Sequence, residues 1–307
     1  MKLAYAAALV APLLAVACSG QGGDPVKDPS SGSGAPTGAS AATGAATNTG
    51  TSAASATSAP ANAAADTATA ATTPEPAAKT AAAPACPEGM ALVPGGTFKM
   101  ELRKDPVTVG SLCMDANEVT ADQYTACVKA GKCTADHLNC AAQATYEAAD
   151  KGNHPIVCVD FNQAVSYCTA QNKRLPSDEE WEWAARGGAE GWAFPWGNNS
   201  PKEQLCWSGV RTRNGTCAVG STPAGDNPQG IHDLAGNVFE WTTSKNDPKT
   251  KVRVGRGGSW KDGIPDLMRS SRPGGFEVTY RCGFLGIRCV IPAPGSASET
   301  AAPAASK

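Results

Sequence analysis

The chain has 307 residues and a formal net charge of −2, and its aromatic residues gather in one region. Of 18 aromatic residues, 17 lie between Phe98 and Phe284, whereas residues 19–85 contain none. We therefore place the foldable part at 86–291, which is long enough for one buried core. The near-neutral charge excludes the basic footprint of a nucleic-acid-binding protein. No apolar run long enough for a membrane helix follows the N-terminus, so a bundle of such helices is not expected.

The N-terminus has the pattern of an export signal. Lys2 precedes a short apolar stretch, Leu3–Ala17, that ends in small residues at a cleavage-site spacing. Cys18 follows at once, and the junction resembles a bacterial lipoprotein signal, with Ala15 where that pattern usually has Leu. We expect residues 1–17 to be removed and Cys18 to be lipidated; cleavage after Ala17 without lipidation is the alternative. Under both interpretations the protein is exported. Under the first it is also anchored to the bacterial cell envelope, either at the outer membrane and periplasm or at the cell surface.

Low-complexity sequence flanks the foldable part on both sides. Residues 18–85 are rich in Ala, Thr, Ser, Gly and Pro, as are residues 292–307. Such segments bury too little apolar surface to offset the entropy of ordering the chain. We predict a linker over 18–85 and a disordered tail over 292–307.

The 12 cysteines favour a disulfide scaffold in an exported protein. No Cys-x2-Cys pair is present, as a structural zinc site would require. If Cys18 carries a lipid, an odd number remains, and at least one thiol lies outside an internal bridge. Cys206 and Cys217 bracket a turn rich in Gly and Asn and could close a short loop. Spacing alone leaves the other connectivities open.

Three helices are predicted, each from a capping box at its N-terminus. The boxes are residues 120–123, 160–163 and 177–180, and Gly131 and Gly187-Gly188 are natural stops for the first and third helices. Short strands are predicted over 90–94, 107–109, 156–159, 252–254 and 284–290. Gly and Pro interrupt most of the remaining chain. The pattern predicts an α+β domain with few regular elements.

Eight ordered motifs resemble the sulfatase-modifying-factor family, also called the formylglycine-generating-enzyme family. They are MALVPGGTF (90–98), NEVT (117–120), HPIV (154–157), KRLPSDEEWEWAARGG (173–188), FPWG (194–197), GNVFEW (236–241), RGGSW (256–260) and GIR (286–288). The resemblance covers nearly all of residues 88–290. It implies an irregular C-type-lectin-like fold, which agrees with the α+β pattern.

The resemblance implies a calcium loop between residues 233 and 240. Asp233 and Glu240 would supply carboxylates, and Gly236 and Val238 would supply backbone carbonyls. Calcium prefers six to eight oxygen ligands and accepts this mixture. A hydrogen-bonded turn without metal is the alternative. The family's other calcium site would need an Asn where this chain has Cys206, so we do not predict it.

The positions of the family's oxidase cysteines hold other residues. Family members that convert a sulfatase Cys to formylglycine use two cysteines spaced Cys-x4-Cys after the Gly-Gly-Ser motif. Two thiolates suit Cu(I), but the matching positions here are Asp262 and Leu267. A copper cofactor is therefore not expected. The resemblance also implies a Cys168–Cys289 disulfide.

We therefore expect a lipoprotein that acts as a binding or structural module at the cell envelope and lacks the oxidase. The alternative is a formylglycine-generating oxidase. A candidate ligand groove includes Arg256, Ser259, Trp260 and Asp262. The sequence does not choose between a protein and a glycan as the envelope partner, and nothing in it points to nucleic acid.

Overall fold

The computed structural model describes residues 85–296 apart from residues 104 and 247. The predicted export signal, the lipidation site Cys18 and most of the predicted linker lie outside the described residues. No helix in the described part of the chain is long and apolar enough to cross a membrane.

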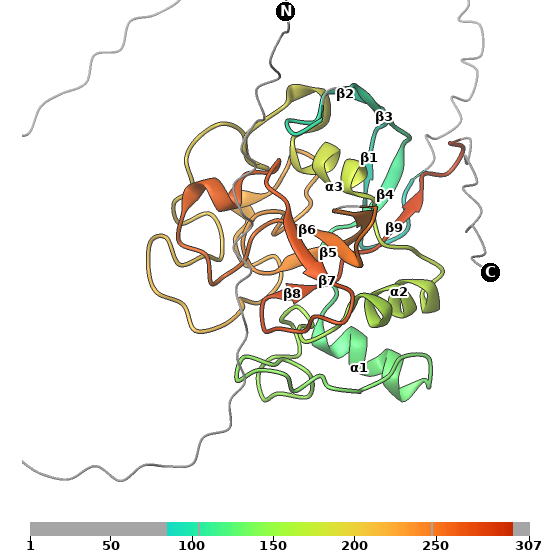
Figure 1. Ribbon diagram of the computed structural model, residues 1–307, viewed down its shortest axis with the longest axis vertical. Coiled ribbons are helices and arrows are strands. Elements are labelled where there is room, and N and C mark those ends of the chain that lie inside the picture. The colour runs from blue at the N-terminus through green and yellow to red at the C-terminus, as the bar shows by residue number, and fades with distance from the viewer. Residues whose placement is uncertain (1–84, 104, 247, 297–307) are drawn as a thin grey trace, which may run out of the picture. The chain divides into compact units, whose positions relative to one another are not determined.

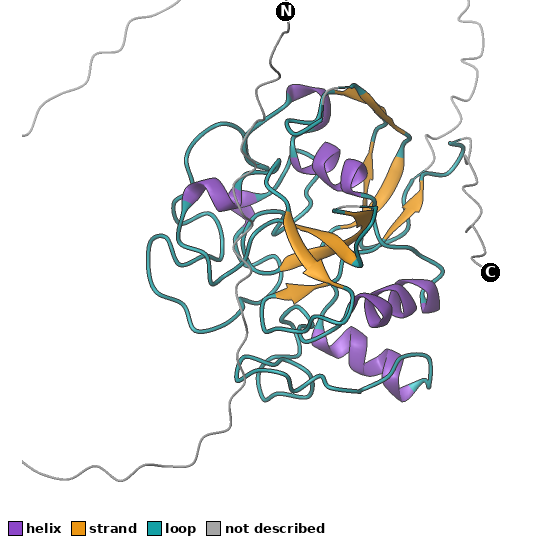
Figure 2. Ribbon diagram, in the orientation of Figure 1, coloured by secondary structure: helices purple, strands orange, loops and turns teal. Residues whose placement is uncertain are grey.

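Nine short strands, three short α-helices and three 3-10 helices make up the regular structure of the described residues, and loops form most of the remainder (Figures 1 and 2). The 3-10 helices are η1 (Gly188–Glu190), η2 (Pro223–Gly225) and η3 (Pro265–Met268). The helices are α1 (Ala121–Lys129), α2 (Phe161–Ala170) and α3 (Asp178–Ala185). The strands are β1 (Met90–Val93), β2 (Gly96–Phe98), β3 (Val107–Val109), β4 (Leu112–Asp115), β5 (Phe239–Lys245), β6 (Val252–Arg256), β7 (Gly274–Glu277), β8 (Leu285–Gly286) and β9 (Val290–Pro292).

All three predicted helices are present, and each begins with the predicted capping box. In each box the N-cap side chain, Thr120, Asp160 or Ser177, accepts a hydrogen bond from the backbone amide three residues later. The side chain at that later position accepts one from the N-cap amide. These reciprocal bonds pair donors that a helix N-terminus otherwise leaves unsatisfied. Because capping depends on only four consecutive residues, local sequence was sufficient to predict it.

The strands form three small sheets. β1, β4 and β9 form one antiparallel sheet in the order β1-β4-β9, and β2 pairs with β3. The third sheet has the order β7-β6-β5-β8, in which β8 runs parallel to β5. The last strand, β9, pairs with β4 and so joins the C-terminal part of the domain to its first sheet (Figure 1).

Two sequence predictions about strands were wrong. Residues 156–159 form no strand, because Cys158 has a positive φ of 65° that no regular strand accommodates. The predicted strand over 284–290 is instead two short strands, β8 and the start of β9.

The predicted start of the disordered tail was also too early. Pro292 ends β9 opposite Leu112, and the Ala293 amide donates to the Ser111 carbonyl. Ala293 is buried. The low-complexity composition of the tail gave no sign of this pairing, because strand pairing uses backbone groups and not particular side chains.

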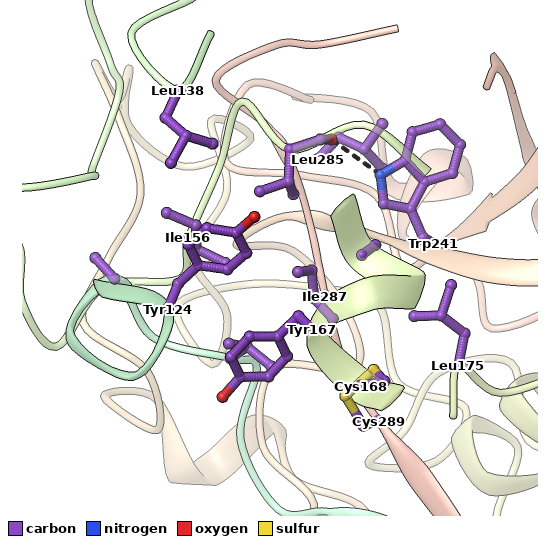
Figure 3. Packing of buried hydrophobic residues seen from close by; sticks show 14 of the residues in the cluster. Tyr124, Leu138, Ile156, Tyr167, Cys168, Leu175, Trp241, Leu285, Ile287 and Cys289 are labelled. Atoms are coloured by element: carbon purple, nitrogen blue, oxygen red, sulfur yellow. Dashed lines mark hydrogen bonds between the residues drawn. A yellow bond between two sulfur atoms is a disulfide. The ribbon is translucent and has the colours of Figure 1, made fainter. Parts of the chain in front are cut away.

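The largest core cluster includes residues of α1, α2, β5 and β8 (Figure 3). Tyr124 of α1 stacks on Tyr167 of α2 with ring centroids 5.6 Å apart. Trp241 of β5 is fully buried and donates its indole N–H to the Val159 carbonyl at 3.1 Å. The Cys168–Cys289 disulfide crosses the same region, so it ties α2 to the C-terminal segment (Figure 3).

Candidate functional site

The segment from Asp233 to Glu240 is a tight loop that leads into β5. Asp233, Gly236 and Asn237 all have positive φ, at 57°, 84° and 50°. A Cβ on Gly236 would lie 2.6 Å from the Cys206 carbonyl oxygen, so this position requires glycine for both its backbone angle and its close packing. The loop therefore has a fixed conformation that brings its polar groups together.

Glu240 forms the centre of a buried ion pair with Arg288. Both side chains have no exposed surface, and the Arg288 Nη2 lies 2.7 Å from Glu240 Oε1. The Arg288 Nε donates to both Glu240 oxygens at 3.0 Å, and the Trp181 indole donates to Oε2 at 2.6 Å. Arg288 also donates to the carbonyls of Asp115 and His232. Both carboxylate oxygens of Glu240 therefore accept charged or polar hydrogen bonds.

Asp233 lies at the other end of the loop and is also buried. Its carboxylate accepts a hydrogen bond from the Gly220 amide at 2.7 Å and one from the Thr222 hydroxyl at 3.3 Å. Burial raises the pKa of this carboxyl above its ordinary value, and these hydrogen bonds together with Arg288 oppose the rise.

Glu118 is a third buried carboxyl that sequence reasoning missed. It accepts from the Asn237 side chain at 2.6 Å and from the Val238 amide at 3.2 Å, so it holds the middle of the loop. Burial first, and then the charges of Asp233 and Glu240, raise the pKa of Glu118 well above its ordinary value. Its position in the NEVT motif was the available signal, but nothing local connects residue 118 with residue 238.

The cluster contains three buried carboxyl groups and one guanidinium. If all of them are ionised, negative charge exceeds positive charge inside the protein, and such an excess is costly without a compensating cation. The four predicted ligands supply only oxygen donors, which fits the preference of calcium. Within the described residues, no group of three or more His, Cys, Asp or Glu side chains is arranged to hold a metal ion. Any calcium ligation would therefore depend on the loop carbonyls together with two carboxylates.

The candidate groove predicted at residues 256–262 is not supported by the burial of its residues. Arg256 and Ser259 are each 1% exposed and Trp260 is 6% exposed, which leaves a ligand little surface to contact. Arg256 pairs with Asp178 at 2.5 Å and Glu182 at 2.9 Å, so it joins α3 to β6. Including Arg256 in a groove was wrong, because pairing two helix carboxylates requires it to lie in the interior.

Asp262 and Leu267, which occupy the positions of the family's oxidase cysteines, lie in two different environments. The Asp262 carboxylate accepts a hydrogen bond from the Ser259 hydroxyl at 2.8 Å, and burial raises its pKa above the ordinary value. Leu267 packs with a small apolar cluster that includes Trp207 and Met268. Neither side chain offers a soft ligand for copper.

The described residues contain five disulfides, among them both of the bridges that we expected. They join Cys86–Cys113, Cys127–Cys133, Cys140–Cys158, Cys168–Cys289 and Cys206–Cys217. The Cys168–Cys289 bridge has a sequence separation of 121 residues, for which the chain-entropy model gives a stabilisation of about 4–5 kcal/mol. Cys282 is buried and takes no part in these five bridges.

Comparison with known proteins agrees with this fold. The model of the sulfatase-modifying factor enzyme 1-like domain matches residues 75–293, which is more than two thirds of the chain. The chain belongs to this family. The sulfatase-modifying-factor domain accordingly includes every helix and strand described above.

Relatives of this sulfatase-modifying-factor domain include proteins named formylglycine-generating enzyme and proteins named inactive Cα-formylglycine-generating enzyme 2. An inactive Cα-formylglycine-generating enzyme 2 of Bos taurus is 41% identical over 123 residues, which cover 37% of this chain and 40% of that protein. A formylglycine-generating enzyme of Mus musculus is 36% identical over 136 residues, which cover 36% of each chain. The alignments thus span well under half the length of these relatives.

Solved structures support the same fold for the domain. PvdO from Pseudomonas aeruginosa has a TM-score of 0.55 and 25% identity, over 66% of this chain and 93% of that one. CarF has a TM-score of 0.54 and 24% identity, over 66% and 97%, and shows the fold alone. The irregular, C-type-lectin-like α+β fold expected from sequence is confirmed.

Proposed function

We propose that this protein is an exported sulfatase-modifying-factor domain without formylglycine-generating activity, which serves as a binding or structural module at the cell envelope. The observation that carries the proposal is the pair of residues at the oxidase positions. Asp262 is engaged by Ser259, and Leu267 is packed in an apolar cluster. The similarity to relatives named inactive supports the same conclusion.

The cysteine pairing gives independent support. Ten of the eleven cysteines among residues 85–296 are in disulfides. Copper(I) bound by two thiolates needs two reduced cysteines close together. This pairing leaves no two such thiols in the described part of the chain.

The second candidate is a formylglycine-generating oxidase, favoured by the identity to enzymes of that name. To distinguish the two, a peptide with a sulfatase-type Cys motif is incubated with the full chain, copper and oxygen, and then analysed by mass spectrometry. The proposal expects an unchanged Cys, while an active formylglycine-generating enzyme converts it in parallel. Conversion by this protein would overturn the proposal, and loss of that conversion in Asp262→Asn would place the chemistry at residue 262.

Localisation and partner belong to the same proposal. The Ala15-Val16-Ala17-Cys18 junction favours a lipid anchor on Cys18, and residues 19–85 would connect this anchor to the domain in the chain. The partner would be an envelope protein or a glycan. The intact mass of the mature N-terminus decides the anchor: an unmodified Cys18 terminus in the soluble fraction would contradict it.

Calcium is the proposed cofactor. Asp233 and Glu240 would contribute carboxylates and Gly236 and Val238 backbone carbonyls. The ion would supply positive charge to a cluster that holds three buried carboxyl groups and one guanidinium. Its effect would be structural, since the loop conformation depends on the same polar groups.

A further inference from the structure

A hollow in the surface is lined by residues outside the 233–240 loop. Its volume is about 570 Å³, within the range of small-molecule sites. It is lined by Ala135, His137, Leu138, Asn139, Cys140 and Arg281. Neither the family resemblance nor the proposed function uses these residues.

Part of the lining of the hollow is Cys140, which is bridged to Cys158. Cys140 is exposed, whereas Cys158 has no exposed surface. Every other bridged cysteine in the described residues is buried or half-buried. Cys140 is therefore the most exposed of these bridged cysteines. We expect a small nucleophile to reach it first, since accessibility is a main determinant of disulfide exchange.

The inner residue of the bridge is held in an unfavourable conformation next to a positive charge. Cys158 has a φ of 65°, which is rare for a residue other than glycine and costs free energy. Its amide donates to the Cys282 carbonyl at 3.0 Å, and its carbonyl accepts from Arg281 Nη1 at 3.1 Å. Arg281 is in turn fixed by Asp160 at 2.6 Å.

The segment between the two cysteines is also held in place without the bridge. Thr145 is buried, and its hydroxyl donates to the Pro155 carbonyl at 2.8 Å and accepts from the Val157 amide at 3.2 Å. These bonds cross the same loop that the disulfide closes. Opening the bridge would therefore leave the two cysteines close enough to pair again.

We propose that the Cys140–Cys158 bridge is a thiol-exchange site for low-molecular-weight thiols, which enter through the hollow. A thiolate attacks the Cys140 sulfur, forms a mixed disulfide there and breaks the bond to Cys158. The electron pair of the broken bond leaves on the Cys158 sulfur. Attack by Cys158 on the mixed disulfide reverses the step, so the protein alternates between a closed bridge and an S-thiolated Cys140.

The test uses the full chain and reduced glutathione as the probe. After incubation at pH 8, the protein is quenched with acid, its thiols are alkylated and its peptides are mapped by mass spectrometry. We expect about tenfold more glutathione on Cys140 than on Cys86 or Cys217, the half-buried members of two other bridges. Earlier or greater modification of either of those cysteines would overturn the proposal, as would the absence of an adduct on Cys140.

A variant tests the return step. In Cys158→Ser, oxidised glutathione transfers one glutathione to the Cys140 thiol and releases the other as reduced glutathione. No thiol remains at position 158 to displace this adduct, so it should persist after free glutathione is removed. In wild type treated with reduced glutathione, removal of the free glutathione should restore the bridge. An adduct that persists equally in both proteins would refute the role of Cys158. The measurement on wild type remains decisive even if the variant folds poorly.

Discussion

Replacing Arg288 with methionine should strongly destabilise the domain. Arg288 is fully buried, makes three contacts of 2.7–3.0 Å with Glu240 and also pairs two backbone carbonyls. Methionine keeps much of the apolar stem but supplies no donor. Glu240 would then be a buried carboxylate with only the Trp181 indole as its partner.

The magnitude follows from the burial of the pair. Removing one member of a buried ion pair typically costs about 3–5 kcal/mol, because the remaining charge stays uncompensated. A matched control is Arg174→Met. Arg174 also pairs with a glutamate, Glu180, at 2.6 Å, but its side chain is 45% exposed. Pairs of that kind contribute about 0–1 kcal/mol.

Urea unfolding with intact disulfides measures both variants against wild type. The free energy of unfolding comes from linear extrapolation, and the m-value reports whether the same surface is exposed in each protein. We expect Arg288→Met to lose at least about 3 kcal/mol and Arg174→Met to lose less than about 1 kcal/mol. Equal losses, or a loss below about 1 kcal/mol for Arg288→Met, would refute the idea that burial sets the strength of this pair.

Three further predictions concern the candidate site and its surroundings. If calcium binds the loop, a calcium concentration 100 times the dissociation constant stabilises the native state by about 2.7 kcal/mol. Chelation of calcium should therefore lower the melting temperature of wild type and have a smaller effect on Asp233→Asn. Equal effects on the two proteins would remove the assignment. Gly236→Ala should lower the free energy of unfolding in urea by more than about 1 kcal/mol. Gly230→Ala should cost less, because Gly230 has a similar φ but no atom within 4 Å of the added Cβ. Similar costs would show that packing against Cys206 is unimportant. Because burial raises the pKa of Asp262, the folded state binds the proton of this carboxyl more tightly than the unfolded state does. Wild type should therefore lose stability relative to Asp262→Asn as the pH rises from the unfolded pKa, about 3.9, through the folded pKa. Parallel curves of stability against pH for the two proteins would contradict the direction of the shift.

Local sequence determined the helices and the family. A capping box needs only four neighbouring residues, so Thr120, Asp160 and Ser177 marked the helix starts without any knowledge of the fold. The motifs identified the domain for the same reason, since each is a short run of residues in a fixed order. The short Cys206–Cys217 loop was also within reach, as its two ends are only 11 residues apart.

Only the tertiary structure decided how distant charges and cysteines are paired. Glu118 holds a loop about 120 residues away, and Arg256 is buried between two carboxylates of α3, which removed it from the predicted groove. Residues 156–159 have the apolar composition of a strand, but Cys158 has a positive φ and a bridge to Cys140. Hydrogen bonds and ion pairs between remote segments depend on the position of the whole backbone, and short sequence patterns contain no information about that position.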